Sequence, residues 1–154
     1  MTDRAPTDGD GAAGVLICDD NESVRTLLGV IVDGSLGMRV VGEATDGKEA
    51  IAEATVLQPD VILLDLAMPN LGGLEALPEL RRVAPDAQIV VFSGFASATV
   101  AEQVLALGAA SYVEKGAHPD TIVATIGQAL RRNGKSPLAG ASSSRGAEIR
   151  TRDL

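Results

Sequence analysis

The sequence is poor in aromatic residues, in cysteine and in long apolar runs. Its 154 residues include two Phe, one Tyr and no Trp, although 45% of the residues are hydrophobic. The core must therefore be built from Val, Leu, Ile and Ala, which suits parallel strands covered by helices. The single cysteine, Cys18, excludes an internal disulfide and fits a reducing compartment. No apolar run approaches the roughly 18 residues that mark a membrane span, so none is expected.

Basic residues are outnumbered by acidic ones. The chain has 13 Lys and Arg against 21 Asp and Glu, which gives a formal net charge of −8. Surfaces that bind nucleic acids are usually basic, so we expect no nucleic-acid binding through this chain alone. The N-terminal segment is acidic and lacks the apolar core of a secretory signal. These absences favour a cytoplasmic α/β domain that does not bind membranes.

Composition divides the chain into three regions. Residues 1–13 are polar and Gly-rich, and we expect a disordered leader. Residues 133–154 are rich in Gly, Ser, Ala and Arg without an apolar period, which indicates a flexible tail or a truncated linker. Residues 14–132 alternate five times between a short apolar run and a longer stretch with helical spacing. The five predicted strands are 15–18, 39–42, 61–64, 89–92 and 111–113.

Strands that alternate with helices predict right-handed βαβ crossovers and a parallel sheet covered on both faces. Five such units fit the flavodoxin-like, doubly wound (βα)5 fold with strand order 2-1-3-4-5. Boundary residues agree, because Asn21 can cap the first helix, Gly34 can end it and Pro119 suits a first helical turn. Pro78 lies beyond the tolerated first turn, so the third helix is expected to start late or to bend.

Three aspartates stand where such a fold binds ligands. In this strand order the connections reverse between the first and third strands, and ligands bind there, beyond the carboxyl ends of the strands. Asp19 and Asp20 follow the first strand, and Asp65 follows the third. Each one alone could be an ordinary strand end or helix cap, but three carboxylates at one point repel each other. Oxygen donors without a nearby Cys or His suit Mg²⁺, or Mn²⁺, rather than Zn²⁺.

A hydroxyl and an ammonium are predicted at the same edge of the sheet. Ser93 follows the fourth strand, and Lys115 follows the fifth. Taken singly, they are an ordinary loop serine and an ordinary surface lysine. Together with the acids they make a site suited to phosphoryl transfer, in which the metal and the lysine would neutralise charge on the phosphoryl oxygens. Catalysis in such a site rests on positioning and electrostatics.

Four segments resemble the signature blocks of response-regulator receiver domains, namely 16–22, 65–73, 92–94 and 112–115. The resemblance covers about residues 14–131 and implies a role for each matching residue. Asp65 would be the phosphoacceptor. Asp20, Asp65 and the backbone carbonyl of Ala67 would bind Mg²⁺ directly, whereas Asp19 would act through a metal-bound water. Lys115 would contact the phosphoryl group.

The resemblance also implies a switch and its partners. An aspartyl phosphate adds charge and acceptor oxygens, so the Ser93 hydroxyl would move to it and the Tyr112 ring would fill the vacated space. The switching face would be the fourth helix, fifth strand and fifth helix. The phosphoryl donor would be a sensor histidine kinase or a histidine phosphotransfer protein. The target would be an unidentified downstream protein, with a phosphorylation-dependent homodimer also compatible. No turnover substrate beyond the chain's own phosphorylation and dephosphorylation is expected.

One position departs from the family pattern. Many receivers place Pro directly after the lysine, often with a cis peptide bond, whereas here Gly116 follows Lys115. No cis bond is therefore expected at this turn. The segment 112–117 is more similar to receivers that precede a LuxR-type helix-turn-helix output domain, and no such domain is recognised in residues 133–154.

Other functions stay open on the sequence alone. The chain is compatible with a pseudo-receiver that binds partners without phosphorylation, or with the receiver part of a DNA-binding regulator. A flavin-binding protein of the same topology needs a phosphate loop with N–H donors where Asp19 and Asp20 stand. A phosphohydrolase with an aspartate nucleophile commonly carries a second acid where Ala67 stands. Ala67 and Phe95 are also expected to control the access of water to Asp65.

Overall fold

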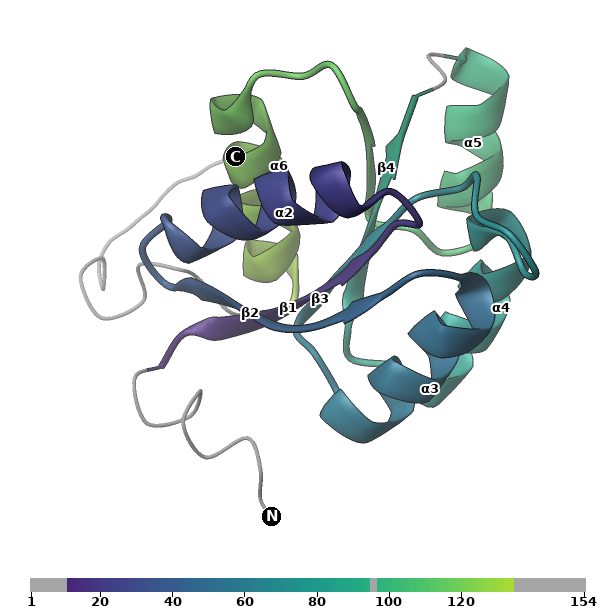
Figure 1. Cartoon of the computed structure of the whole chain (residues 1–154), viewed down its shortest axis with the longest axis horizontal. Coiled ribbons are helices and arrows are strands. Elements are labelled where there is room, and N and C mark those ends of the chain that lie inside the picture. The colour runs from purple at the N-terminus through teal and green to yellow at the C-terminus, as the bar shows by residue number, and fades with distance from the viewer. Residues whose placement is uncertain (1–10, 95–96, 135–154) are drawn as a thin grey trace.

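The computed structural model describes residues 11–94 and 97–134, in which strands and helices alternate (Figure 1). The five strands pair in parallel in the order β2-β1-β3-β4-β5, which confirms the predicted fold. The elements are β1 Ala13–Cys18, α2 Glu22–Asp33, β2 Met38–Ala44, α3 Gly47–Leu57, β3 Val61–Leu64, α4 Gly73–Val83, β4 Gln88–Ser93, α5 Ala98–Ala106, β5 Ser111–Glu114 and α6 Pro119–Arg132.

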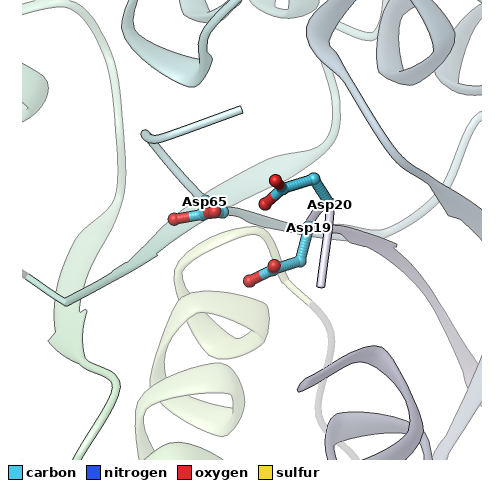
Figure 2. A group of neighbouring side chains, drawn as sticks. All are labelled: Asp19, Asp20 and Asp65. Atoms are coloured by element: carbon cyan, nitrogen blue, oxygen red, sulfur yellow. The ribbon is translucent and has the colours of Figure 1, made fainter. Parts of the chain in front are cut away.

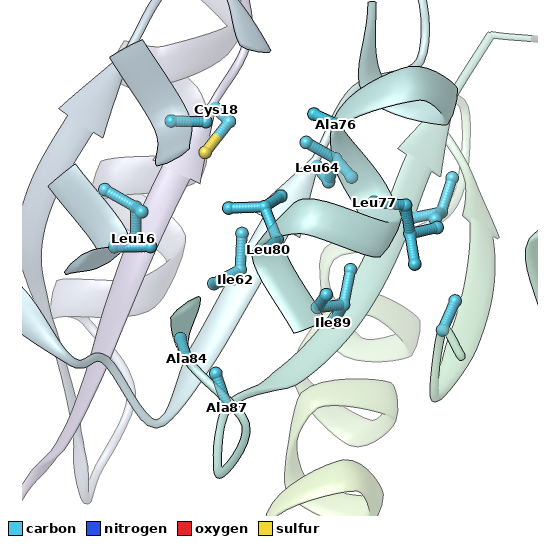
Figure 3. Packing of buried hydrophobic residues seen from close by; sticks show 14 of the residues in the cluster. Leu16, Cys18, Ile62, Leu64, Ala76, Leu77, Leu80, Ala84, Ala87 and Ile89 are labelled. Atoms are coloured by element: carbon cyan, nitrogen blue, oxygen red, sulfur yellow. The ribbon is translucent and has the colours of Figure 1, made fainter. Parts of the chain in front are cut away.

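The sheet separates two aliphatic cores. Successive side chains of a strand point to opposite faces, so Leu16 and Cys18 of β1 belong to one core and Val15 and Ile17 to the other. Helices α3, α4 and α5 cover the first core, part of which is drawn in Figure 3. Helices α2 and α6 cover the second core and lie together on the other face of the sheet in Figure 1. Both faces of the central strands are therefore closed to solvent.

Local signals explain most helix boundaries. The Asn21 side chain accepts a hydrogen bond from the backbone N–H of Val24 and caps α2, and Gly34 ends this helix, as predicted. Pro119 occupies the first turn of α6, also as predicted. The prediction of a late start at Pro78 is wrong, because α4 already begins at Gly73 and runs through the proline.

Packing explains why α4 tolerates its proline. Pro78 lacks the N–H that would bond to the Leu74 carbonyl and is exposed on the solvent side of the helix. The opposite side buries Ala76, Leu77 and Leu80 completely against the sheet. This apolar contact is formed by tertiary packing, which a local rule about proline does not include.

The ends of the domain differ slightly from the predicted limits. The leader was expected to extend to residue 13, but β1 begins at Ala13, which pairs with Met38. Helix α6 ends at Arg132. The rest of the predicted leader and tail, residues 1–10 and 135–154, lie outside the described residues. Among the described helices, none combines the length and the apolarity that a membrane crossing requires.

Candidate functional site

The three predicted aspartates meet at the carboxyl ends of β1 and β3. Asp19, Asp20 and Asp65 each offer one carboxylate oxygen, and these atoms all lie within 4.8 Å of one another (Figure 2). Asp19 and Asp65 are buried, with 0% and 2% of their surface exposed, whereas Asp20 is exposed. The sequence therefore identified this acid cluster correctly.

Backbone hydrogen bonds hold two of the aspartates in register with the sheet. The Asp19 N–H donates to the Ala44 carbonyl at 3.0 Å, and the Asp65 N–H donates to the Cys18 carbonyl at 2.9 Å. Both bonds continue the pairing of β1 with its neighbours one residue past the strand ends. The positions of these two acids thus follow from strand pairing and not from a mobile loop.

Lys115 provides the positive charge of the site. Its Nζ lies 2.9 Å from Asp19 Oδ2 and 3.3 Å from Asp65 Oδ1. Burial lowers the pKa of the Lys115 ammonium, but the two carboxylates outweigh this effect and the net shift is upward. Lys115 is therefore charged at neutral pH and partly neutralises the buried acids.

The two oxygens of Asp65 have different surroundings. Oδ1 accepts a hydrogen bond from the Ala67 N–H at 3.3 Å and lies next to Lys115, whereas Oδ2 is buried without a hydrogen-bond partner among the described residues. Burial raises the pKa of Asp65, and the charge of Asp19 raises it further. Lys115 and the Ala67 N–H act in the opposite direction but do not cancel the rise.

An unpartnered buried carboxylate oxygen in an acid cluster fits a hard cation. Each such oxygen carries a desolvation cost that a ligand atom removes on binding. The nearby donors are oxygens, and the cluster contains no His and no Cys ligand, which suits Mg²⁺ or Mn²⁺. The residues present thus fit the metal that the sequence predicted.

The two predicted switch residues lie on neighbouring strands. Ser93 is the last residue of β4, is fully buried, and its carbonyl accepts a hydrogen bond from the Lys115 N–H at 2.8 Å. Tyr112 of β5 is half-buried and packs against the core shared by α3, α4 and α5, and its hydroxyl is buried without a partner among the described residues. The structure places Ser93 beside the lysine, while the switching roles of both residues stay predictions.

Some of the other predicted features can be compared with the structure. Ala67 is exposed beside Asp65, and its proposed carbonyl ligation stays a prediction. Phe95 lies outside the described residues. No cis peptide bond occurs in the described part of the chain, in agreement with the expectation for Gly116.

The structure adds residues that sequence analysis missed. Gly73 approaches the backbone of Asp65 and Leu66 so closely that no side chain fits there. Arg25 of α2 donates to the backbone carbonyl of Asp19 at 2.8 Å and to Glu43 Oε1 of β2 at 2.9 Å. The sequence did contain a signal for Arg25. The residue lies near the N-terminus of α2, where the helix dipole disfavours a positive charge, so its presence there points to another interaction.

Comparison with known proteins identifies the family of this chain. The family model of the response regulator receiver domain matches residues 15–127. Response regulator UvrY of Escherichia coli (strain K12) is 37% identical over 112 residues, which are 73% of this chain and 51% of that protein. Response regulator GacA of Pseudomonas aeruginosa is 38% identical over 114 residues, 74% of this chain and 53% of that protein. The chain spans about half the length of these curated relatives.

A solved structure agrees in fold and sequence. The crystal structure of a two-component response regulator of the LuxR family from Aurantimonas sp. SI85-9A1 matches with a TM-score of 0.75 and 30% sequence identity. The match covers 81% of this chain and 88% of that chain. The matched family segment contains all three aspartates and Lys115.

Proposed function

Because the chain belongs to the response-regulator receiver family of two-component systems, we propose that it is switched by a phosphoryl group accepted on Asp65. The donor is a histidine kinase or a histidine phosphotransfer protein. The observation that carries the proposal is the buried Asp65 carboxylate, which has one oxygen without a hydrogen-bond partner among the described residues and lies beside Asp19, Asp20 and the Lys115 ammonium.

The side chains divide the work of phosphoryl transfer. A carboxylate oxygen of Asp65 forms the new bond to phosphorus, the P–N bond of the phosphohistidine donor breaks, and its electron pair stays on the imidazole. Lys115, 3.3 Å from Asp65 Oδ1, places a positive charge where the negative charge of the phosphoryl oxygens gathers. Lys115 also favours the ionised form of Asp65, which is the nucleophilic form.

Asp20, Asp65 and the carbonyl of Ala67 would hold Mg²⁺, and Asp19 would act through a metal-bound water. When bound, the ion neutralises the acid cluster and the phosphoryl oxygens. The cluster of three carboxylates supports this assignment, since Lys115 forms ion pairs with only two of them, Asp19 and Asp65. Mn²⁺ has the same preference for oxygen ligands and should substitute.

Phosphorylation by a small donor tests the proposal directly. With acetyl phosphate and millimolar Mg²⁺, the intact mass should rise by one phosphoryl group, and the gain should disappear on chelation of the metal. Asp65→Asn should not be modified, and Asp86→Asn, an exposed aspartate far from the site in the α4–β4 loop, serves as the matched control. Equal labelling of wild type and Asp65→Asn would refute the assignment of Asp65.

The output follows from the switch. Ser93 moves toward the phosphoryl group, Tyr112 repacks, and the surface of α5, β5 and α6 changes its affinity for a downstream protein or for a second copy of the chain. The chain turns over no substrate other than its own phosphoryl group, and it acts in the cytoplasm. Amide chemical shifts of β5 and α5 that do not change on addition of beryllofluoride and Mg²⁺ would favour the pseudo-receiver alternative.

A DNA-binding output is the second candidate. The curated relatives are about twice as long as the matched segment, and the Aurantimonas protein is named a LuxR-family regulator. The net charge of −8 argues against DNA binding through this chain alone. The reading frame downstream of residue 154 decides this point, since a helix-turn-helix pattern there would assign the chain as the receiver part of a transcriptional regulator.

A further inference from the structure

A second layer of contacts lies behind the acid pair. The Arg25 guanidinium connects the end of β1 to β2, because Nη1 donates to the carbonyl of Asp19, the residue after β1, at 2.8 Å and Nε donates to Glu43 Oε1 at 2.9 Å. The Arg25 side chain is only 15% exposed. The guanidinium fork thus binds a backbone carbonyl at the metal site with one arm and a carboxylate of β2 with the other.

A β-bulge directs Glu43 to this position. Val15 pairs with Val40, but Leu16 pairs with Gly42, so Val41 is an extra residue in β2. Without it, residues 40 and 43 would point to opposite faces of the sheet. With it, Glu43 pairs with Ile17 and shares the face covered by α2, where Arg25 lies. Bulges commonly turn a side chain toward a functional site in this way.

The direction of the Asp20 side chain depends on the orientation of the Asp19–Asp20 peptide. Asp19 is held by its own N–H on Ala44 and by its Oδ1, which accepts from the Asn21 N–H at 2.9 Å. Within residues 11–94 and 97–134, no hydrogen bond or ion pair holds the carboxylate of Asp20. The Asp19 carbonyl belongs to the planar Asp19–Asp20 peptide, so the bond from Arg25 fixes the plane from which Asp20 departs.

We propose that Arg25 is a positioning residue for the cation-binding acid pair and that Glu43 holds Arg25 in place. The inference rests on the proposed function, since it concerns the same acids. Arg25 orients the peptide that carries Asp20, and Glu43 keeps the guanidinium on the carbonyl and away from the Asp20 carboxylate. Asp20 therefore stays open for the cation and does not form an ion pair with Arg25.

The direction in which Mg²⁺ affinity changes on removal of Arg25 distinguishes a positioning role from a purely electrostatic one. A positive charge near the site repels a divalent cation, so its removal alone should strengthen Mg²⁺ binding. Loss of a group that orients a metal ligand typically weakens metal affinity by about 10- to 100-fold. Because Arg25 acts through a peptide and not directly on the ligand atom, we expect a loss of affinity at the lower end of this range. Arg25→Gln should thus raise the Kd for Mg²⁺ about tenfold, whereas a purely electrostatic role requires a lower Kd.

The experiment titrates the whole chain with Mg²⁺ alone and follows heat by calorimetry and amide shifts by NMR. Arg25→Gln should weaken binding, and Arg25→Lys, which keeps the charge but lacks the fork, should fall between it and wild type. In the metal-free protein, the carbonyl carbon shift of Asp19 should change in both variants, because it reports the lost hydrogen bond directly. The matched control is Arg82→Gln, which removes an exposed Arg on α4 that also pairs with a Glu, Glu79, away from the site.

A double-mutant cycle tests the part played by Glu43. Glu43→Gln should weaken Mg²⁺ binding in the wild-type background but have little effect in the Arg25→Gln background, because Glu43 acts through Arg25. Additive losses would show that Glu43 acts only as a nearby negative charge and would overturn its role. Glu43 is 52% exposed, so this variant should fold even where Arg25→Gln does not.

The remaining outcomes are distinct. Unchanged or tighter Mg²⁺ binding by Arg25→Gln would overturn the positioning role while leaving the proposed function intact. An equal loss in Arg82→Gln would also overturn it, because the effect would not be specific to the site. A wild-type chain that does not bind Mg²⁺ at all would instead contradict the proposed function, and this inference with it.

Discussion

Gly73 offers a sharp test of how the loop after β3 is built. A Cβ at this position would lie against the Asp65 carbonyl oxygen and 2.9 Å from both Asp65 C and Leu66 Cα. Overpacking of this kind costs about 1–3 kcal/mol. The obstructing atoms belong to the backbone and cannot move aside as a flexible side chain would. We therefore expect Gly73→Ala to lower the free energy of unfolding by about 3 kcal/mol. At roughly 4 °C per kcal/mol, the melting temperature should fall by about 12 °C.

Gly29→Ala is the matched control. Gly29 lies inside α2, and a Cβ there meets nothing within 4 Å. Alanine in a helix interior is more stable than glycine by about 0.5–1 kcal/mol, so this variant should be stabilised. The same substitution thus has opposite signs at two helical positions. Urea unfolding followed by far-ultraviolet circular dichroism measures both, and a Gly73→Ala variant within about 1 kcal/mol of wild type would refute the steric argument.

Three further predictions concern the charges of the site. In the metal-free protein the pKa of Asp65 is raised above its ordinary 3.8, so the folded state holds this proton more tightly than the unfolded state. The contribution of Asp65 to the free energy of unfolding therefore falls as the pH rises from 3.8, the pKa of the unfolded state, through the higher pKa of the folded state. Above the folded-state pKa the contribution stays low. Asp65→Asn should accordingly be more stable than wild type at neutral pH in chelator, a difference that vanishes below pH 3.8; equal stability at neutral pH would contradict the sign. Mg²⁺ at 100 times its Kd should stabilise wild type by about 2.7 kcal/mol in thermal unfolding, and an equal gain in Asp65→Asn would argue for a site elsewhere. Lys115→Gln removes a cation that opposes the rise, so an NMR titration of the Asp65 carboxyl carbon should show a still higher pKa, and a lower one would refute the assigned interaction.

The sequence predicted the parts of this molecule that depend on local pattern. Each apolar run became a strand, and β3 has the predicted bounds. Because the carboxyl ends of parallel strands share one edge, knowing that Asp19 and Asp65 end neighbouring strands was enough to bring them together. Lys115 was located by the same argument, and it lies 2.9 Å from Asp19 Oδ2.

The parts that depend on register and packing were not predictable. The contact between Arg25 and Glu43 joins residues 18 positions apart and exists because of one extra residue in β2, which no composition or period reveals. Pro78 misled the prediction for α4 because a local rule was applied to a helix that tertiary contacts hold together. The close approach of Gly73 to Asp65 also follows from the path of the loop in space.

The stability cost of the acid cluster and its response to ligands have one physical origin. Two aspartates are buried with a single ammonium between them, and backbone bonds to Cys18 and Ala44 prevent them from moving apart. The fold thus retains a repulsion that a bound cation would relieve, which supports the proposed Mg²⁺ site. In the proposed function, a phosphoryl group on Asp65 would place new negative charge beside Lys115, whose backbone N–H donates to the Ser93 carbonyl at the end of β4. Under this proposal, a change in charge at Asp65 would reach β4 and β5 through Lys115, which follows β5 and bonds to the end of β4. We therefore expect Lys115→Gln to abolish the amide shift changes of β5 on phosphorylation while Mg²⁺ still binds.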